Sequence, residues 1–274
     1  MKYMSFNNSC SYAGIANLLL DYSIDIEDYQ VAIETKVPYI FRYDEHWKRY
    51  VSGSMLQADR YFNFYLQNLS LQLVGNEFTK ESALDFLKKL QCRAMIGLNV
   101  SNGRKHAVIY SGVEADKYIF MNNKRKDSQE PDFYRFSFNE LLYKMDETVF
   151  ISYLENRLGG VKIDLTPEIK DSFFYLQEYK ENVAGFCSEV QGVDALNKGM
   201  STLFHAFFLD VYSMMVIIGE KQLSEGIGDL RNSYLQAMRL KQPLRLSEYI
   251  SIEYFKKAID EYKKIIHIRV IDGF

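Results

Sequence analysis

The spacing of apolar positions predicts a mixed first part of the chain and a helical second part, with the change near residue 155. In the first part, helical periodicity covers 11–22, 25–36 and 54–68. Thr79 can cap a further helix that runs to Leu90, and Ser137 with Glu140 forms a capping box. β-rich runs lie at 93–100, 106–113, 117–121 and 148–153, of which the middle two predict a hairpin. Helices thus precede a small sheet, which is typical of an α+β fold.

The sequence Leu158-Gly159-Gly160 separates the two parts. After it, Thr166-Pro167-Glu168 has the form of a helix start, with proline in the first helical position. Long stretches of apolar periodicity follow at 167–182, 186–219, 222–240 and 247–265. The β-branched tail at 267–271 predicts a closing strand. We therefore expect a mixed domain over 1–157 and a mainly helical cap or substrate domain over 161–274.

Composition excludes several classes of function. With 47% apolar and 25% charged residues and a net charge of −3, the chain has the balance of a soluble globular protein. So small a net charge gives no reason to expect a nucleic acid or an anionic membrane surface as partner. The most apolar window, 203–218, is interrupted by His205 and Asp210 and is shorter than the ~20 residues that a bilayer requires. We expect it to be a buried core helix.

The cysteines bear on the compartment of the protein. There are three, at 10, 92 and 187, too few and too scattered for a disulfide framework or a zinc site. We find no basic segment followed by an apolar stretch that would indicate a secretory signal. The expectation is a cytoplasmic protein with reduced thiols, no metal and no cofactor. The oligomeric state stays open.

Cys10 follows a polar loop, Asn7-Asn8-Ser9, and precedes an apolar helical stretch from Tyr12 to Leu20. This places a thiol at a helix N-terminus, where unsatisfied N–H groups and the helix dipole favour the thiolate. Because the thiolate is the nucleophilic form, the placement suits covalent catalysis. The alternative is that Cys10 is a small buried residue.

His106 begins the strand that runs to Tyr110, and the next strand ends sixteen residues later in Met121-Asn122-Asn123. A hairpin places the start of one strand beside the end of its neighbour, so His106 and Asn122 are expected to be close. An asparagine carbonyl can accept the ring N–H and fix the tautomer of the imidazole. The alternative is a surface histidine at a strand edge, with asparagines in a turn.

These features together resemble the papain-like peptidases of the C39 type. The resemblance is carried by Asn8-Ser-Cys-Ser-Tyr-Ala-Gly14, His106-Ala-Val-Ile-Tyr110 and Tyr118-Ile-Phe-Met-Asn-Asn123, and it covers about residues 1–155. Within that group, the chain is most similar to the butirosin-type acyltransferases. The resemblance implies a papain-like catalytic domain over 1–157, with helices packed on a small antiparallel sheet.

The resemblance also implies roles for the site residues. Cys10 becomes the nucleophile, His106 the general base and acid, and Asn122 the residue that orients the imidazole. Asn123 is the alternative candidate for this orienting role. The C39 pattern usually has a glutamine about six residues before the cysteine to bind the oxyanion, and Met4 stands there. Its third residue is normally an Asp followed by Pro, whereas here two asparagines follow one another. Oxyanion donors are then sought in the Cys10 backbone N–H and in two side chains, those of Asn7 and Asn8.

The same cysteine and histidine serve hydrolysis and acyl transfer, since water or an amine can attack the thioester. The size and position of the second domain match the extra domain of butirosin-type acyltransferases, which use carrier-protein thioesters. The chain also lacks the ABC-transporter parts with which C39 peptidases that process leader peptides usually occur. A basic rim for a phosphopantetheine phosphate or an acidic carrier protein is expected from Arg104, Lys105, Lys124, Arg125 and Lys126. An ordinary solvated turn is the alternative for these charges.

The leading hypothesis is a cysteine acyltransferase that joins an acyl group from a carrier protein, or another thioester donor, to an amine acceptor. Such enzymes occur in thiotemplated antibiotic biosynthesis, as in closthioamide assembly. A C39-like cysteine peptidase or amidase is the second hypothesis, and a non-catalytic binding protein of the same fold is the third. The aromatic run from Tyr39 to Tyr50 can serve either as core or as a pocket for a planar acyl group.

Overall fold

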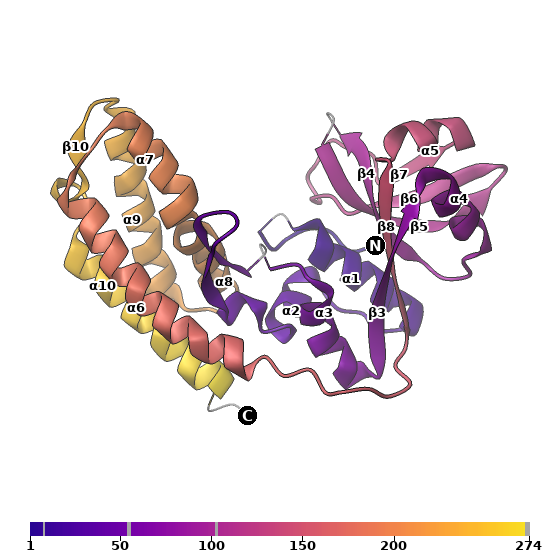
Figure 1. Ribbon diagram of the computed structural model, residues 1–274, viewed down its shortest axis with the longest axis horizontal. Helices are drawn as coiled ribbons and strands as arrows, with labels where there is room; N and C mark the ends of the chain where they lie inside the picture. Colours follow the sequence, from indigo (N-terminus) through magenta and orange to yellow (C-terminus); the bar gives the residue numbers. More distant parts are fainter. Residues whose placement is uncertain (8, 54–55, 102–103, 272–274) are drawn as a thin grey trace. The chain divides into compact units, whose positions relative to one another are not determined.

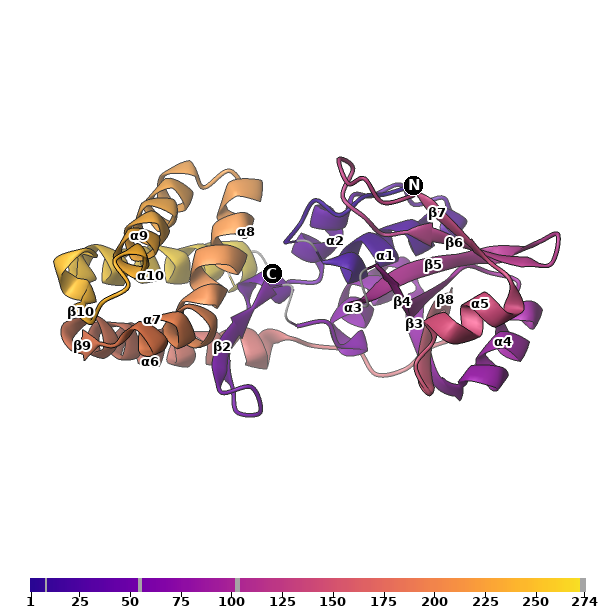
Figure 2. The ribbon, with the colours of Figure 1, turned by 90° about the horizontal axis from the view of Figure 1, so that it is seen from above.

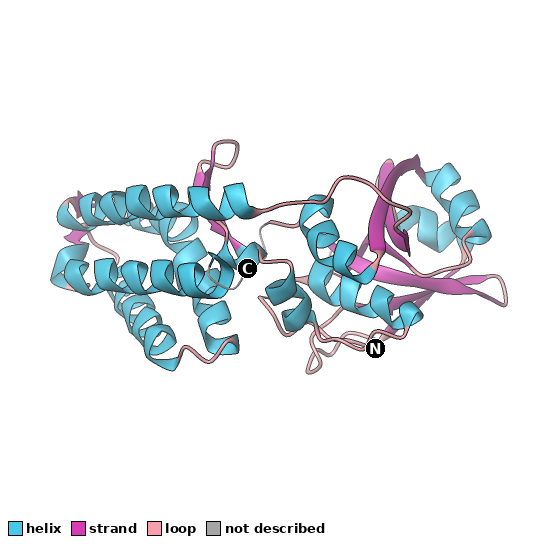
Figure 3. Ribbon diagram, turned by 90° about the horizontal axis from the view of Figure 1, so that it is seen from below, coloured by secondary structure: helices cyan, strands magenta, loops and turns pink. Residues whose placement is uncertain are grey.

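The computed structural model describes residues 1–7, 9–53, 56–101 and 104–271, and its contacts divide the chain into two compact units. Unit 1 consists of Met1–Thr35 and Gln57–Ile163, and unit 2 of Lys36–Leu56 and Asp164–Phe274. The second unit is thus discontinuous in sequence, because the segment at 36–56 packs with the C-terminal helices. Strands gather in unit 1 and helices make up most of unit 2 (Figure 3).

The helices of unit 1 are α1 (Cys10–Leu19), α2 (Asp28–Glu34), α3 (Asp59–Leu66), α4 (Lys80–Lys89) and α5 (Phe138–Lys144). The predicted caps are confirmed. The Thr79 hydroxyl accepts the Ser82 N–H at the start of α4. The capping box of Ser137 and Glu140 begins α5, with both reciprocal hydrogen bonds present.

A six-stranded antiparallel sheet forms the rest of unit 1 (Figures 1 and 2). Its strands are β3 (Leu71–Thr79), β4 (Ala94–Ser101), β5 (Arg104–Glu114), β6 (Lys117–Asn122), β7 (Phe133–Phe136) and β8 (Thr148–Asn156). Their spatial order is β3-β8-β4-β5-β6-β7. The predicted hairpin is β5–β6, which confirms that part of the sheet, and the expected α+β class is confirmed as well.

The two faces of the sheet carry different helices. Ala94, Ile96 and Val108 belong to an apolar cluster with residues of α4 and α5. Met95 lies between Ala94 and Ile96 in β4 and therefore points to the other face. A Cβ added at Gly14 of α1 would collide with the Met95 sulfur, so α1 lies closely against that other face. The helix that begins with Cys10 is thereby fixed on the sheet.

Unit 2 is mainly helical, as expected from the sequence. It contains α6 (Thr166–Ser188), α7 (Val193–Gly199), π-helical turns at Met200–Phe204 and Ala206–Val211, α8 (Tyr212–Ile217), α9 (Lys221–Arg239) and α10 (Ile252–Ile266), with short strands β9 (Val190–Gln191) and β10 (Leu244–Arg245). The prediction of a closing strand at 267–271 is wrong, because His267–Ile271 continues α10 as a π-helical turn. Val270 lies four residues past Ile266 and is buried beside it, so the apolar face of α10 continues.

The apolar window at 203–218 forms a bent helix, and its side chains at Phe204, Phe207 and Phe208 are fully buried. The bend between Val193–Phe204 and Ala206–Ile217 is 52°. Within the described residues, no single helix has the length and hydropathy needed to cross a membrane, whereas these two helices taken together do.

The aromatic run in the segment at 36–56 belongs to the core of unit 2. It forms a hairpin of β1 (Phe41–Asp44) and β2 (Arg49–Ser52). The rings of Phe41 and Tyr50 stack on one another and lie 5.0 and 4.8 Å from the ring of Tyr179 in α6. The Phe41 N–H also donates to the Ser172 hydroxyl of α6, at 2.9 Å. These contacts explain why the segment joins the C-terminal helices.

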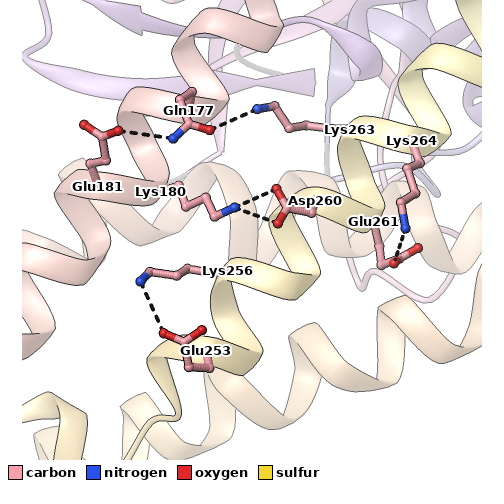
Figure 4. A network of polar contacts seen from close by, with 9 residues as sticks. All are labelled: Gln177, Lys180, Glu181, Glu253, Lys256, Asp260, Glu261, Lys263 and Lys264. Carbon is pink, nitrogen blue, oxygen red and sulfur yellow. Dashed lines mark hydrogen bonds and ion pairs between the residues drawn. The ribbon is translucent and has the colours of Figure 1, made fainter.

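Polar contacts join α6 to α10 along their exposed sides (Figure 4). The Lys180 ammonium binds both carboxylate oxygens of Asp260, at 2.8 and 2.6 Å. One turn away, Lys263 donates to the side-chain carbonyl of Gln177 at 3.4 Å. The pairs Glu253–Lys256 and Glu261–Lys264 lie within α10 and do not bridge the helices.

Candidate active site

Cys10 is the first residue of α1, and the loop before it is held in place by Asp28. This carboxylate is fully buried at the start of α2 and accepts the backbone N–H groups of Ser5 and Phe6, at 2.6 and 2.9 Å. A turn follows in which the Ser9 N–H donates to the Phe6 carbonyl at 3.0 Å. The loop therefore presents the thiol at a fixed place on the helix N-terminus.

His106 lies in β5, opposite Leu98 of β4. The structure brings its imidazole to the Cys10 thiol, and the two side chains are hydrogen-bonded. The backbone of Ala107 also interacts with the thiol. A cysteine at the start of a helix on an antiparallel sheet, beside a histidine of a central strand, is the arrangement that the papain-like resemblance implied.

The two groups shift one another's ionisation. Burial raises the pKa of the Cys10 thiol, but the hydrogen bond to His106, the Ala107 backbone and the charge of His106 together bring this pKa below its ordinary value. Burial lowers the pKa of His106, whereas the hydrogen bond to Cys10 and the thiolate charge raise it above its ordinary value overall. Both shifts favour a thiolate–imidazolium pair.

The other two cysteines differ from Cys10 in this respect. Burial raises the pKa of the Cys92 thiol, and the nearby Asp21 carboxylate adds to the effect. Burial raises the pKa of the Cys187 thiol to about 12. Of the three thiols, Cys10 is therefore the one whose pKa is lowered.

Asn122, at the end of β6, pairs with Val108 and is thus the diagonal neighbour of His106. Three acceptors lie within hydrogen-bond distance of its side-chain Nδ2, which has two hydrogens to share among them: Glu130 Oε2 at 3.2 Å, the Pro131 carbonyl at 3.0 Å and the Tyr134 hydroxyl at 3.0 Å. Among the described residues, Asn122 Oδ1 and His106 Nε2 are both buried without a hydrogen-bond partner. One is an acceptor and the other a potential donor.

Asn123 is the alternative candidate for the orienting role, but its side chain is hydrogen-bonded to other residues. Its Oδ1 accepts from Asn17 Nδ2 at 2.8 Å, and its Nδ2 donates to the Ala107 carbonyl at 3.1 Å. Its backbone instead interacts with His106 and favours the protonated ring. The side chain of Asn123 thus connects β6 to α1 and β5, while its peptide group contributes to the site.

The expected oxyanion donors are only partly described. Asn8 lies outside the described residues. Asn7 is half-buried and adopts the left-handed conformation, with φ of 47°. A residue that the sequence did not indicate is Gln57, whose side-chain carbonyl accepts from the Ser11 hydroxyl at 2.6 Å. Ser11 directly follows Cys10, so a second amide side chain lies beside the first turn of α1.

The basic residues expected at the rim divide into two groups. Lys124 is buried, and its ammonium contacts the carbonyls of Ser128 and Glu130, at 3.2 and 2.5 Å, and the Asp132 carboxylate at 3.0 Å. Lys105 forms an ion pair with Asp146 at 2.9 Å. These two ammonium groups therefore have partners within unit 1.

Arg125 and Lys126 are exposed. They border an open depression of about 640 Å³, together with Met4, Ser5 and Asp127. The Met4 N–H donates to the Lys124 carbonyl at 2.8 Å, which joins this N-terminal segment to the loop. The side chain of Arg104 lies outside the described part of the chain.

Two further residues near the site, Glu130 and Tyr134, were not predicted. The Glu130 charge favours the protonated form of His106. Burial raises the pKa of Tyr134 to about 12, with a further contribution from the Glu130 charge, so its hydroxyl stays protonated near neutral pH. Their only signal in the sequence is that they follow Asn122 by eight and twelve residues, and nothing in that spacing indicates a contact.

Comparison with solved structures found fourteen matching chains. One is the peptidase domain of Streptococcus ComA, a bi-functional ABC transporter involved in a quorum-sensing pathway, with 9% identity, a TM-score of 0.38, and 55% of this chain and 95% of that domain covered. Another is a double-glycine-motif protease from an AMS/PCAT transporter in complex with the leader peptide, with 15% identity, a TM-score of 0.37, and 56% and 88% covered. At these identities and TM-scores, the likeness gives no information on the reaction, substrate or partners of this chain. Neither a family model nor a curated protein matches the chain.

Proposed function

We propose that the protein is a cysteine-dependent acyltransferase that forms an amide from an acyl thioester through an acyl-Cys10 intermediate. The observation that carries the proposal is the hydrogen-bonded pair of Cys10 and His106, with the thiol pKa lowered and the imidazole pKa raised. A thiolate at neutral pH is the form that attacks a carbonyl carbon.

The pair accounts for both halves of the reaction. In the first, the Cys10 thiolate attacks the thioester carbonyl, the donor's C–S bond breaks, and the protonated His106 supplies a proton to the leaving thiolate. In the second, an amine attacks the acyl-Cys10 carbonyl and His106 accepts the proton that the amine loses. The Cys10 thiolate leaves and the amide is released, so that the enzyme returns to its starting protonation state.

The oxyanion formed in each half requires donors. The Cys10 backbone N–H at the start of α1 is one, and we propose that an amide side chain from Asn7 or Gln57 is the other. Removing one such donor reduces turnover by roughly 10²–10³-fold in well-studied enzymes. Comparing Asn7→Ala with Gln57→Ala assigns the donor, because the variant that loses turnover without loss of thiol reactivity identifies it.

The donor is proposed to be a carrier-protein thioester, in the setting of a biosynthetic pathway for an antibiotic. The exposed Arg125 and Lys126 at the open depression support this, since a phosphopantetheine phosphate or an acidic protein surface would complement them. Lys124 and Lys105 have internal partners and are not included in this surface.

Intact-protein mass spectrometry after exposure to acyl thioesters tests the proposal. We expect one acyl group on the wild-type protein, no adduct on Cys10→Ala, and an unchanged adduct on the control Cys92→Ala. Addition of an amine should then discharge the acyl-enzyme as an amide. Acylation of the Cys10→Ala variant to the same extent contradicts the proposal.

Hydrolysis is the second candidate, because the same pair forms the same acyl-enzyme whatever attacks it. The site is open enough for Cys10 and His106 to keep partial exposure, which leaves a path for water. Incubation with peptides, and with acyl thioesters plus amines, separates the two candidates. Peptide cleavage without amide formation would replace the transferase by a cysteine peptidase or amidase.

A further inference from the structure

The nine residues after Asn123 form a loop that folds around the ammonium group of Lys124. Lys124 contacts the carbonyls of Ser128 and Glu130 and the carboxylate of Asp132. The loop is also attached to the end of β6, because the Asn122 N–H donates to the Asp132 carbonyl at 2.8 Å. A buried ammonium with three oxygen partners is strongly held, since losing any partner leaves a charge poorly compensated.

The folded loop surrounds the Asn122 side chain with acceptors. Glu130, the Pro131 carbonyl and the Tyr134 hydroxyl all lie within 3.2 Å of Nδ2. A planar amide held by its nitrogen on one side must direct its oxygen to the other side. These contacts therefore fix the positions of the nitrogen and the oxygen of the Asn122 amide. They leave Oδ1 buried without a partner among the described residues.

His106 supplies the complementary group. Its Nε2 is also buried without a partner in the described part of the chain, and His106 and Asn122 are diagonal neighbours across β5 and β6. Leaving a buried donor and a buried acceptor unpaired is unfavourable, so a hydrogen bond between the two groups would stabilise the site. Asn122 Oδ1 is thus an acceptor available to the ring N–H, in addition to the Asn123 backbone that already favours the protonated ring.

We propose that the loop from Lys124 to Asp132 is a positioning element that orients the Asn122 amide and, through it, the His106 imidazole. The proposal deepens the proposed function and rests on it in so far as His106 acts on Cys10. Tyr134 and Glu130 act as positioning residues, because both contact the Asn122 side chain. The Glu130 carboxylate has a second effect, since its charge favours the imidazolium.

The arrangement also explains an asparagine where the C39 pattern has an aspartate. A carboxylate at position 122 has no hydrogen to donate to Glu130 or to the Pro131 carbonyl, although it could accept one from the Tyr134 hydroxyl. It would also place two negative charges in contact at 122 and 130. The loop therefore requires an amide at this position.

The test is the pH dependence of Cys10 alkylation by iodoacetamide, read by mass spectrometry of the peptide that contains Cys10. Tyr134→Phe removes one acceptor while keeping the ring that stacks on Phe136. We expect its alkylation midpoint to move to higher pH than in the wild type, and the same for Asn122→Ala. Glu114 is an exposed carboxylate at the other end of the β5–β6 hairpin. The control variant Glu114→Gln should therefore leave the pH midpoint of Cys10 alkylation unchanged.

A double-mutant cycle distinguishes positioning from a general structural role. If Tyr134 acts through Asn122, then Tyr134→Phe shifts the midpoint in the wild-type background and not in the Asn122→Ala background. Equal shifts in both backgrounds, or no shift in either, overturn the proposal. Alkylation requires no acyl donor, so a protein that shows the expected cycle and yet forms no acyl-enzyme would disprove the proposed function alone.

Discussion

Asn17, in the middle of α1, donates a 2.8 Å hydrogen bond to the side-chain oxygen of Asn123, 106 residues away at the end of β6. Both side chains are fully buried. Asn17 also exchanges hydrogen bonds with the backbone of Lys2, at 2.7 and 3.0 Å. One residue thus connects the nucleophile helix, the N-terminal segment and the strand end that borders His106.

Asn17→Ala should therefore lower the free energy of unfolding by about 1–3 kcal/mol, because it leaves buried groups of Asn123 and Lys2 without partners. Chemical denaturation measures the change. The exposed Asn139, in the first turn of α5, is the matched control, and Asn139→Ala should change stability by less than about 0.5 kcal/mol. Equal effects at the two positions would show that the buried connection contributes nothing.

The ionisation of Cys10 gives a prediction about pH. An ordinary thiol titrates near 8.5, and alkylation follows the thiolate fraction, which rises as the pH passes through the pKa. Because the Cys10 pKa is lowered, its alkylation should begin at a lower pH than that of Cys92, whose pKa is raised. Cys92 is thus an internal control within the same chain.

His106→Ala should move the alkylation midpoint of Cys10 toward that of Cys92. Without the imidazole, burial is left as the largest influence on Cys10 and it raises the thiol pKa, so the alkylation midpoint should move to higher pH. If the midpoint of Cys10 does not rise in the His106→Ala variant, the imidazole is not the source of the lowered pKa.

Much of unit 1 could be predicted because its signals are local. Thr79 and Ser137 are caps whose partners lie three residues away, and the β5–β6 hairpin is encoded by two β-rich runs around a turn. β3 was missed because Gly75 and several polar residues interrupt its apolar alternation, and it is stabilised by pairing with β8, about 80 residues later. Pairing at such separation leaves no pattern in a short window of sequence.

The site shows the same division between local and distant information. The sequence alone predicted a cysteine at a helix start and a histidine sixteen residues before an asparagine. The surroundings of Asn122 were not, because Glu130 and Tyr134 reach it through a loop whose path depends on the burial of Lys124. A lysine among Arg125 and Lys126 looks like part of a solvated basic run, and only the structure shows that it is an interior residue.

Asn122→Asp tests the reason for the departure from the aspartate pattern. At neutral pH we expect a loss of about 1–3 kcal/mol in stability, since a carboxylate cannot donate to Glu130 or to the Pro131 carbonyl and repels Glu130. The loss should shrink as the pH falls and the added carboxyl group becomes protonated. Glu130→Gln in the same chain should restore stability at neutral pH, because the glutamine amide can donate to the new carboxylate. Urea unfolding at pH 5 and pH 7 measures both effects, and a pH-independent loss would contradict the explanation.

The close approach of α1 to the sheet gives a prediction that couples stability to reactivity. A Cβ at Gly14 would collide with the Met95 sulfur and lie 3.2 Å from Asn123 Nδ2. Gly14→Ala should therefore move α1 away from β4, lower stability by about 1–3 kcal/mol, and raise the alkylation midpoint of Cys10 as the thiol leaves His106. Gly185 in α6 is the matched control, since a Cβ there meets no atom within 4 Å, and Gly185→Ala should stabilise the chain by about 0.5–1 kcal/mol.

Adding Met95→Ala to Gly14→Ala should bring the alkylation midpoint of Cys10 back toward the wild-type value. If it does not, the collision with Met95 does not set the distance between the thiol and the imidazole.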